Sequence, residues 1–290
     1  MSEVNRIAGN GCPMVIPEED RKSLKEIEKS IIKKYRKQLW SPFTKAIKEY
    51  NLVKDGDKIA IAISGGKDSL LLAKLFQELK RHGQIQFELE FIAMDPGYHP
   101  SIKALLIENC EHLGIPVHIY ESRIFDIVDG IAQDYPCYMC AKMRRGSLYD
   151  KAQSLGCNKL ALGHHFNDVI ETTLINLFYA GTVKTMLPKL KSQNFENMEL
   201  IRPMYLIREK AIEGFTRSSG IEALNCACMV AAKRTSNMRY DIKELLENMK
   251  ADTKIVEKSI FRALHNINLD ASVGWIKDGE RHSYLDEYDE

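Results

Sequence analysis

The stretch "KIAIAISGGKDSL", residues 58–70, decides the fold of this 290-residue chain. Its apolar, β-branched run at 58–63 predicts a buried strand, and the glycine pair within 64–66 predicts a tight turn. Apolar residues then recur at helical spacing over 69–81. A strand, a glycine turn and a helix in this order are typical of a loop that binds an anion at a helix N-terminus.

The turn differs from the Walker-type loop of kinases and GTPases. That loop places a Ser or Thr directly after its Lys to hold magnesium, whereas Asp68 follows Lys67 here. The backbone N–H groups of the turn can still face one anion, with hydroxyls from Ser64 and Ser69 beside them. Asp68 would repel phosphate unless a magnesium ion lay between them. The sequence therefore predicts a phosphate site with Mg²⁺ on Asp68; a chance glycine turn is the alternative.

Strand and helix patterns alternate along the chain and predict an α/β fold with a parallel twisted sheet flanked by helices. Strand patterns cover 58–63, 87–94, 117–120 and 159–163, and helical patterns cover 69–81, 101–113, 141–155 and about 167–179. Polar residues follow three of the strands, as the glycine turn, Asp95 and His164-His165. Because ligands of open α/β sheets collect at the carboxyl ends of strands, we expect these residues to share one crevice.

The composition narrows the setting in which the protein acts. A net charge of +1 neither favours nor excludes a nucleic-acid partner. No run of about 18 apolar residues and no signal-peptide pattern is present, so we expect a cytoplasmic protein without a membrane partner. The odd count of seven cysteines argues against disulfides and favours metal or redox use of the clustered ones.

Four cysteines lie in two close pairs. Cys137 and Cys140 form a C-x-x-C pair that can hold a metal or cluster from a single turn, and Cys226 or Cys228 can complete the site. By spacing alone, structural zinc, buried thiols and an iron–sulfur cluster all remain open. A cluster held by three cysteines would leave one iron free to bind sulfide.

The order of five motifs resembles the tRNA 2-thiocytidine synthetase family, whose members are ATP-pyrophosphatases of the PP-loop superfamily. The motifs are "SGGKDS" at 64–69, "CYMCAKMRRGSLY" at 137–149, "LGHHFNDVIETTLINLFYAG" at 162–181, "IRPMYLIREKAI" at 201–212 and "NCAC" at 225–228. The likeness covers about residues 25–265 and is most specific in the block 137–181.

The resemblance implies an adenine nucleotide alpha hydrolase-like fold and a tRNA sulfurtransferase. ATP and Mg²⁺ would activate C2 of an anticodon-loop cytidine as an adenylate, with release of pyrophosphate, and sulfur would replace the oxygen. A cysteine-bound 4Fe-4S cluster would serve the sulfur delivery, with a cysteine desulfurase or sulfide as donor. The expected partners are tRNA and a second copy of the chain in a homodimer.

The patterns along the chain, together with the resemblance, predict four segments and a set of site residues. The segments are a flexible arm at 1–20, a basic helical segment at 21–50, a PP-loop ATP-binding domain at 51–185 and a mostly helical region at 186–290 that carries the last cysteine ligand. The nucleotide-binding residues would be Ser64, Gly65, Gly66, Lys67, Asp68, Ser69, Gly163, His164 and His165, the catalytic residues Lys67, Asp68 and Asp168, and the cluster ligands Cys137, Cys140 and Cys226 or Cys228. The family's second cysteine pair is usually C-x-x-C, so the C-x-C of this chain leaves the third ligand open, with Cys226 favoured.

Physical chemistry assigns a task to the charged residues of the predicted site, and two of them also have a purely structural interpretation. Lys67 and magnesium on Asp68 would stabilise the leaving pyrophosphate. Asp168 would contact magnesium or accept a proton during sulfur attack, or else only cap a helix. Asp95 would bind the ribose or base, or else only form a turn before Pro96.

The basic segment has two interpretations. Between Arg21 and Lys48 there are ten Lys or Arg and two acids, which suits a surface for RNA or a solvated helix face. Its aromatic residues Tyr35, Trp40 and Phe43 would stack on bases or, as we favour, pack in the core. Rival functions are thiolation of another tRNA base or a small metabolite, and a nucleotide- and metal-binding regulatory module without catalysis.

Overall fold

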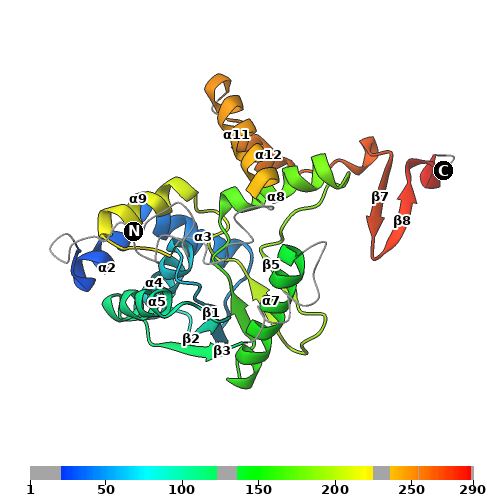
Figure 1. The fold of residues 1–290 in the computed structure, drawn as a ribbon. Helices are drawn as coiled ribbons and strands as arrows, with labels where there is room; N and C mark the ends of the chain where they lie inside the picture. Colours follow the sequence, from blue (N-terminus) through cyan, green and yellow to red (C-terminus); the bar gives the residue numbers. More distant parts are fainter. Residues whose placement is uncertain (1–20, 123–135, 225–235, 254, 289–290) are drawn as a thin grey trace. The chain divides into compact units, whose positions relative to one another are not determined.

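The computed structural model describes residues 21–122, 136–224, 236–253 and 255–288, and gives only the backbone for 136–141, 236–237, 252 and 287. The chain divides into two compact units, Met1–Tyr240 and Asp241–Glu290. The first unit contains a six-stranded sheet between layers of helices (Figure 1).

The sheet is mostly parallel, with the strand order β3-β2-β1-β4-β6-β5. Its strands are β1 (Lys58–Ala62), β2 (Glu88–Asp95), β3 (Val117–Glu121), β4 (Lys159–Ala161), β5 (Lys189–Lys191) and β6 (Glu199–Ile201). Only β5 is antiparallel to its neighbour, β6. The strand order reverses between β1 and β4, so the carboxyl ends of these two strands flank the point where open α/β sheets bind ligands.

Side-chain alternation along β1 explains why both faces of the sheet are covered. Ile59 and Ile61 are fully buried in one apolar cluster, and Ala60 is fully buried in another. The first cluster receives residues from α4 (Lys67–His82), α5 (Pro100–His112) and α9 (Glu209–Ser219). The second receives residues of α7 (Pro136–Ser154). Successive strand residues face opposite layers, which is the pattern of a doubly covered sheet.

The predicted α/β fold is confirmed, and the expected strands and helices lie close to the observed ones. The largest difference is the start of α7 at Pro136 rather than at Ala141. Cys137 and Cys140 therefore lie within the first turns of a helix. The last helix of the predicted series, α8 (Phe166–Tyr179), begins directly after His165.

The basic N-terminal segment is helical but broken. It forms α2 (Leu24–Ile32), a π-helical turn η2 (Arg36–Trp40) and α3 (Ser41–Glu49). The Tyr35 hydroxyl donates to the Gly214 carbonyl at 2.9 Å, and Phe43 is fully buried. These aromatic side chains pack in the core, so the observed contacts agree with the packing interpretation rather than with stacking on bases.

The second unit contains the remainder of α11 (Ser236–Asp252), α12 (Val256–Ala263) and a hairpin of β7 (Gly274–Lys277) and β8 (Glu280–Ser283). Lys250 pairs with Glu257 at 2.6 Å and so joins α11 to α12. Trp275 stacks on His282 across the hairpin, with ring centroids 5.6 Å apart. Across the described parts of both units, no helix is long and apolar enough to cross a membrane.

Candidate active site

The glycine loop, residues 64–69, turns from β1 into α4 at the reversal point of the sheet. Gly65 has φ of +79°, a conformation that side chains disfavour. A Cβ there would lie 2.4 Å from Leu224 Cδ1, so the Leu224 side chain would have to move. Gly66 is the N-cap residue of α4, and the Ser69 hydroxyl donates to its carbonyl at 2.9 Å. The loop therefore presents the free N–H groups at the start of α4, where an anion is favoured.

Lys67 and Asp68 form an ion pair at the start of α4. Lys67 Nζ is 3.2 Å from Asp68 Oδ2 and equally 3.2 Å from Glu209 Oε1 at the start of α9. Asp68 Oδ1 is buried without a hydrogen-bond partner. Burial raises the pKa of the Asp68 carboxyl, although the Lys67 ammonium and the His165 ring oppose that rise. An unsatisfied carboxylate oxygen of this kind suits a hard cation such as Mg²⁺.

Asp168 and His165 cap α8 together. The His165 backbone N–H donates to Asp168 Oδ2 at 3.0 Å, and the His165 ring accepts from the Asp168 N–H at 3.4 Å. The ring also links this cap to the loop, because its Nε2 is 3.8 Å from Asp68 Oδ1 and 3.9 Å from Glu209 Oε1. Asp168 thus has the helix-capping role that was one of its two interpretations, and it lies beside the predicted nucleotide site as well.

The pKa of Asp168 is held low by its neighbours. Burial alone would raise this pKa, but the His165 and His164 rings, the His165 N–H and the Arg239 guanidinium outweigh burial. Arg239 Nη1 lies 3.1 Å from Asp168 Oδ1. The carboxylate is therefore kept ionised and so can accept a proton.

Gly163 lets β4 approach the start of α4. A Cβ on Gly163 would meet the backbone carbonyl carbon of Asp68 at 3.1 Å and its oxygen at 3.2 Å. Because the neighbour is backbone, the helix itself would have to shift. The absence of a side chain at Gly163 therefore brings the loop and the His164-His165 turn together.

His164 lies on the other side of this turn. Burial, reinforced by Arg202, Arg239 and Arg145, lowers the pKa of His164 to about 4, against the opposing charge of Asp168. Its Nδ1 is buried without a hydrogen-bond partner, as is Nε of Arg202 at the end of β6. His164 is therefore neutral at pH 7, and the charges that act on it are those of Asp168 and three arginines.

Asp95 lies at the carboxyl end of β2. Its Oδ1 accepts hydrogen bonds from the N–H groups of Gly97 at 3.0 Å and Tyr98 at 2.8 Å, and its Oδ2 pairs with Lys103 at 2.9 Å. These bonds match the turn-forming interpretation. A cavity of about 730 Å³ lies beside Asp95, and it is lined also by Lys103 of α5 and by Glu121 at the carboxyl end of β3.

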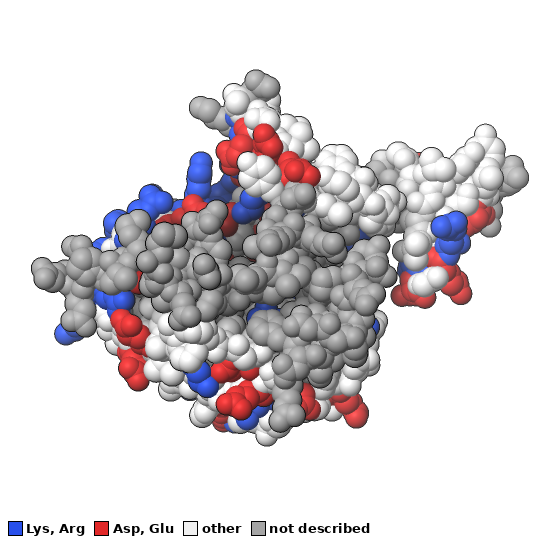
Figure 2. Space-filling model, in the orientation of Figure 1, with Lys and Arg blue, Asp and Glu red and all other residues white. Residues whose placement is uncertain are grey.

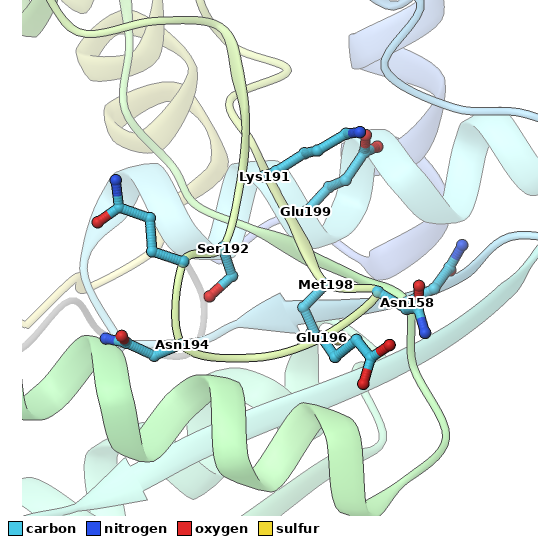
Figure 3. A pocket seen from close by; sticks show the side chains of 9 residues that line it. Asn158, Lys191, Ser192, Asn194, Glu196, Met198 and Glu199 are labelled. Atoms are coloured by element: carbon cyan, nitrogen blue, oxygen red, sulfur yellow. The ribbon is translucent and has the colours of Figure 1, made fainter. Parts of the chain in front are cut away.

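A second cavity of about 730 Å³ lies at the opposite ends of the parallel strands, where β4 and β6 begin (Figure 3). Asn158, directly before β4, and Met198, directly before β6, line it together with polar residues of the β5–β6 turn. Because ligands of such sheets bind at the carboxyl ends of strands, this cavity is not the candidate active site.

The predicted cysteine ligands fall largely outside the described residues. Cys137 and Cys140 lie in α7, where only the backbone is described, and Cys226 and Cys228 lie wholly outside. The described chain stops before Cys226 at Leu224, whose N–H donates to the Gly65 carbonyl at 2.9 Å. Among the side chains that are described, no group of three His, Cys, Asp or Glu could hold a metal ion.

Glu209 and Arg239 were not singled out from the sequence. Glu209 lies inside the quoted motif at 201–212, but nothing in its local pattern distinguishes it from the other acids of the chain. Arg239 lies in a helical stretch without any motif. Only the tertiary structure brings these two residues to Lys67 and Asp168.

Comparisons with known proteins show which family the chain resembles. Residues 35–225 match the family described as PP-loop domain. The tRNA-cytidine(32) 2-sulfurtransferase of Citrifermentans bemidjiense is 37% identical over 227 residues, which is 77% of this chain and 88% of that protein. The protein of the same name from Geobacter metallireducens is 35% identical over 237 residues, 81% of this chain and 91% of its own length.

A solved structure shares the fold. The U34-tRNA thiolase NcsA from Methanococcus maripaludis, with its 4Fe-4S cluster, superposes with a TM-score of 0.61 at 24% sequence identity. The match covers 80% of each chain.

Proposed function

Because this chain belongs to the tRNA-cytidine 2-sulfurtransferase family of PP-loop proteins, we propose that it thiolates C2 of an anticodon-loop cytidine in tRNA at the expense of ATP. The observation that supports this most is the convergence of Lys67, Asp68 and Asp168 at the reversal point of the sheet. The reaction would adenylate the C2 oxygen, release pyrophosphate and then replace the oxygen by sulfur. With tRNA as substrate, we expect the reaction in the cytoplasm.

The loop residues have defined tasks in the adenylation step. The N–H groups at the start of α4 and the Lys67 ammonium would hold the β- and γ-phosphates, on which negative charge grows as pyrophosphate leaves. Asp68 would hold Mg²⁺, and its buried, unsatisfied Oδ1 supports this assignment. Magnesium, when bound, supplies positive charge to the departing phosphates.

Asp168 would act in the sulfur-transfer step. Its carboxylate is ionised and is positioned by the His165 N–H at 3.0 Å and by Arg239 at 3.1 Å. We assign to it the acceptance of the proton from the attacking sulfur. His164 and His165 would line the nucleotide site, with His165 joining Asp168 to the loop.

The iron–sulfur cluster would be held by Cys137, Cys140 and Cys226 or Cys228. Three thiolates form a soft donor set that suits iron and sulfide, and the 4Fe-4S cluster of the structurally similar thiolase supports this choice. A cluster bound in this way supplies an open iron for the transferred sulfur, which a cysteine desulfurase or sulfide would provide.

A basic surface would bind the tRNA. Lys and Arg side chains gather along the upper left of the face shown in Figure 2, where Figure 1 places α9. The segment from Arg21 to Lys48 alone has ten Lys or Arg and two acids. Such a surface binds phosphates independently of sequence and loses affinity with salt. A homodimer, expected from the resemblance, would bring two such surfaces together.

The decisive experiment measures modified nucleosides. Mass spectrometry of tRNA from cells with and without the protein should show loss of 2-thiocytidine alone. Loss of a different thionucleoside would favour the rival in which another base is thiolated. An unchanged nucleoside pattern would contradict tRNA thiolation altogether.

A second experiment tests the chemistry in vitro. Anaerobically reconstituted protein should form AMP when ATP and bulk tRNA are supplied together. Absence of both AMP formation and ATP–pyrophosphate exchange would favour a regulatory module without catalysis.

The third cluster ligand is tested separately. Cys226→Ala and Cys228→Ala proteins, reconstituted anaerobically, should differ in iron content, with the greater loss in Cys226→Ala. Equal iron in both variants would contradict the assignment of a single third ligand.

A further inference from the structure

Lys67 lies between two carboxylates rather than beside one. Its Nζ is 3.2 Å from Asp68 Oδ2 and 3.2 Å from Glu209 Oε1. Glu209 is fixed in place from two directions, because it opens α9 and its backbone N–H donates to Asn167 Oδ1 of α8 at 3.0 Å. The contact between Glu209 and Lys67 is therefore built into the packing of α4, α8 and α9.

Glu209 changes the charge that a phosphate group would meet. Lys67 contributes one positive charge, and Asp68 and Glu209 contribute two negative charges. The third carboxylate nearby, Asp168, is matched separately by Arg239 at 3.1 Å. The three side chains around the loop therefore carry a net charge of −1, although the site is otherwise built to attract anions.

This charge balance disfavours a polyphosphate without a metal ion. The three side chains are 21% to 31% exposed, so their charges are only partly screened by water. A divalent cation would change the local charge from −1 to +1. Without Glu209, the local charge would be zero even in the absence of the cation.

We infer that Glu209 is a positioning residue that holds Lys67 and makes phosphate binding depend on magnesium, so that the site selects Mg·ATP over free ATP. This inference rests on the proposed function, which assigns ATP and magnesium to the loop. Glu209 acts through Lys67, because the Lys67 ammonium is the group that would otherwise be available to the phosphates.

The test measures binding of inorganic pyrophosphate to the full-length protein by calorimetry, in excess Mg²⁺ and in EDTA. Glu209→Gln preserves the shape of the side chain and removes its charge. We expect metal-free pyrophosphate to bind Glu209→Gln about fivefold more tightly than wild type, the scale for one unit charge several ångströms away in a partly exposed site. The gain in affinity on adding Mg²⁺ should shrink accordingly.

The matched control is Glu213→Gln. Glu213 is exposed and lies one turn further along α9. This variant should keep the wild-type ratio of the two affinities. If Glu209→Gln does not fold, Glu209→Asp provides the second test, because its shorter side chain keeps the charge but loosens the contact with Lys67, and it should show a smaller shift in the same direction.

A double-mutant cycle separates positioning from mere stabilisation. In a Lys67→Ala background, Glu209→Gln should gain less than half as much metal-free affinity as it does with Lys67 present, because only the direct repulsion by the Glu209 charge is then removed. An equal gain in both backgrounds would mean that Glu209 does not act through Lys67 and would overturn the inference.

The remaining outcomes are equally distinct. An unchanged magnesium dependence in Glu209→Gln would overturn the inference and leave the proposed function standing. A wild-type protein that binds no pyrophosphate in either condition would overturn both.

Discussion

The carbonyl oxygen of Gly65 accepts a hydrogen bond of 2.9 Å from the backbone N–H of Leu224. Gly65 lies in the middle of the glycine loop, and Leu224 is the last described residue before the segment that contains Cys226 and Cys228. The predicted nucleotide site and the chain that leads to the last cysteines are therefore connected directly. Strain in the loop at Gly65 should affect both.

Gly65→Ala should weaken pyrophosphate binding. The substitution forces a side chain into the left-handed region at φ of +79° and places its Cβ 2.4 Å from Leu224 Cδ1. Gly56→Ala is the matched control, because Gly56 has φ of +83° but nothing within 4 Å of its Cβ position. Both variants should lose about 1 kcal/mol of unfolding free energy from backbone strain, and Gly65→Ala should lose more. Equal thermal stability and equal pyrophosphate affinity in the two variants would contradict the steric role of Leu224.

Lys67→Ala should reduce AMP formation by about 10²- to 10³-fold, the scale for removing one group that stabilises transition-state charge. The iron content and visible absorbance of the reconstituted protein should not change, because no cysteine lies in the glycine loop. AMP formation is measured by chromatography after incubation with ATP and tRNA. Turnover at the wild-type rate would remove Lys67 from the mechanism.

Arg239→Gln should move the acid limb of the pH–rate profile to higher pH. Arg239 is one of the charges that hold the pKa of Asp168 down, and its loss lets that pKa rise. The ionised base is then lost at a higher pH on acidification. Because the Arg239 side chain is 47% exposed, activity at neutral pH should fall by less than about fivefold. An exposed control, Arg217→Gln on α9, should leave the profile in place; an unmoved profile in Arg239→Gln would argue against Asp168 as the base.

His164 should make the protein less stable in mild acid. Burial lowers the pKa of this ring from 6.5 to about 4, so between these values the unfolded chain binds a proton that the folded protein does not. The free energy of unfolding should therefore be unaffected above pH 6.5, fall as the pH drops through this window, and lose about 3 kcal/mol by pH 4. Urea unfolding at several pH values measures the slope of the unfolding free energy against pH. The slope should flatten in His164→Asn and persist in His118→Asn, whose ring is exposed; a slope retained in both variants would refute the assignment.

Local patterns predicted the parts of the fold that depend on neighbouring residues. The period of two in β1 and the helical period of α4 can be recognised from a short stretch of sequence, and adjacent glycines between such segments usually form a tight turn. Strand β5 and the β7–β8 hairpin were not indicated, because segments of three or four residues are too short to show a period. The start of α7 at Pro136 was placed late, because the residues around Cys137 and Cys140 lack an apolar repeat.

The sequence by itself determined that a glycine turn joins β1 to α4 and which polar residues follow the strands, since backbone conformation and helix termini depend on residues close together in the chain. The tertiary structure decided which charges meet there. Glu209 reaches Lys67, and Arg239 reaches Asp168, only because the folded chain brings residues that are far apart in sequence close together in space. Coulomb energy depends on distance in space and not on separation in sequence, so no local pattern could have identified these partners.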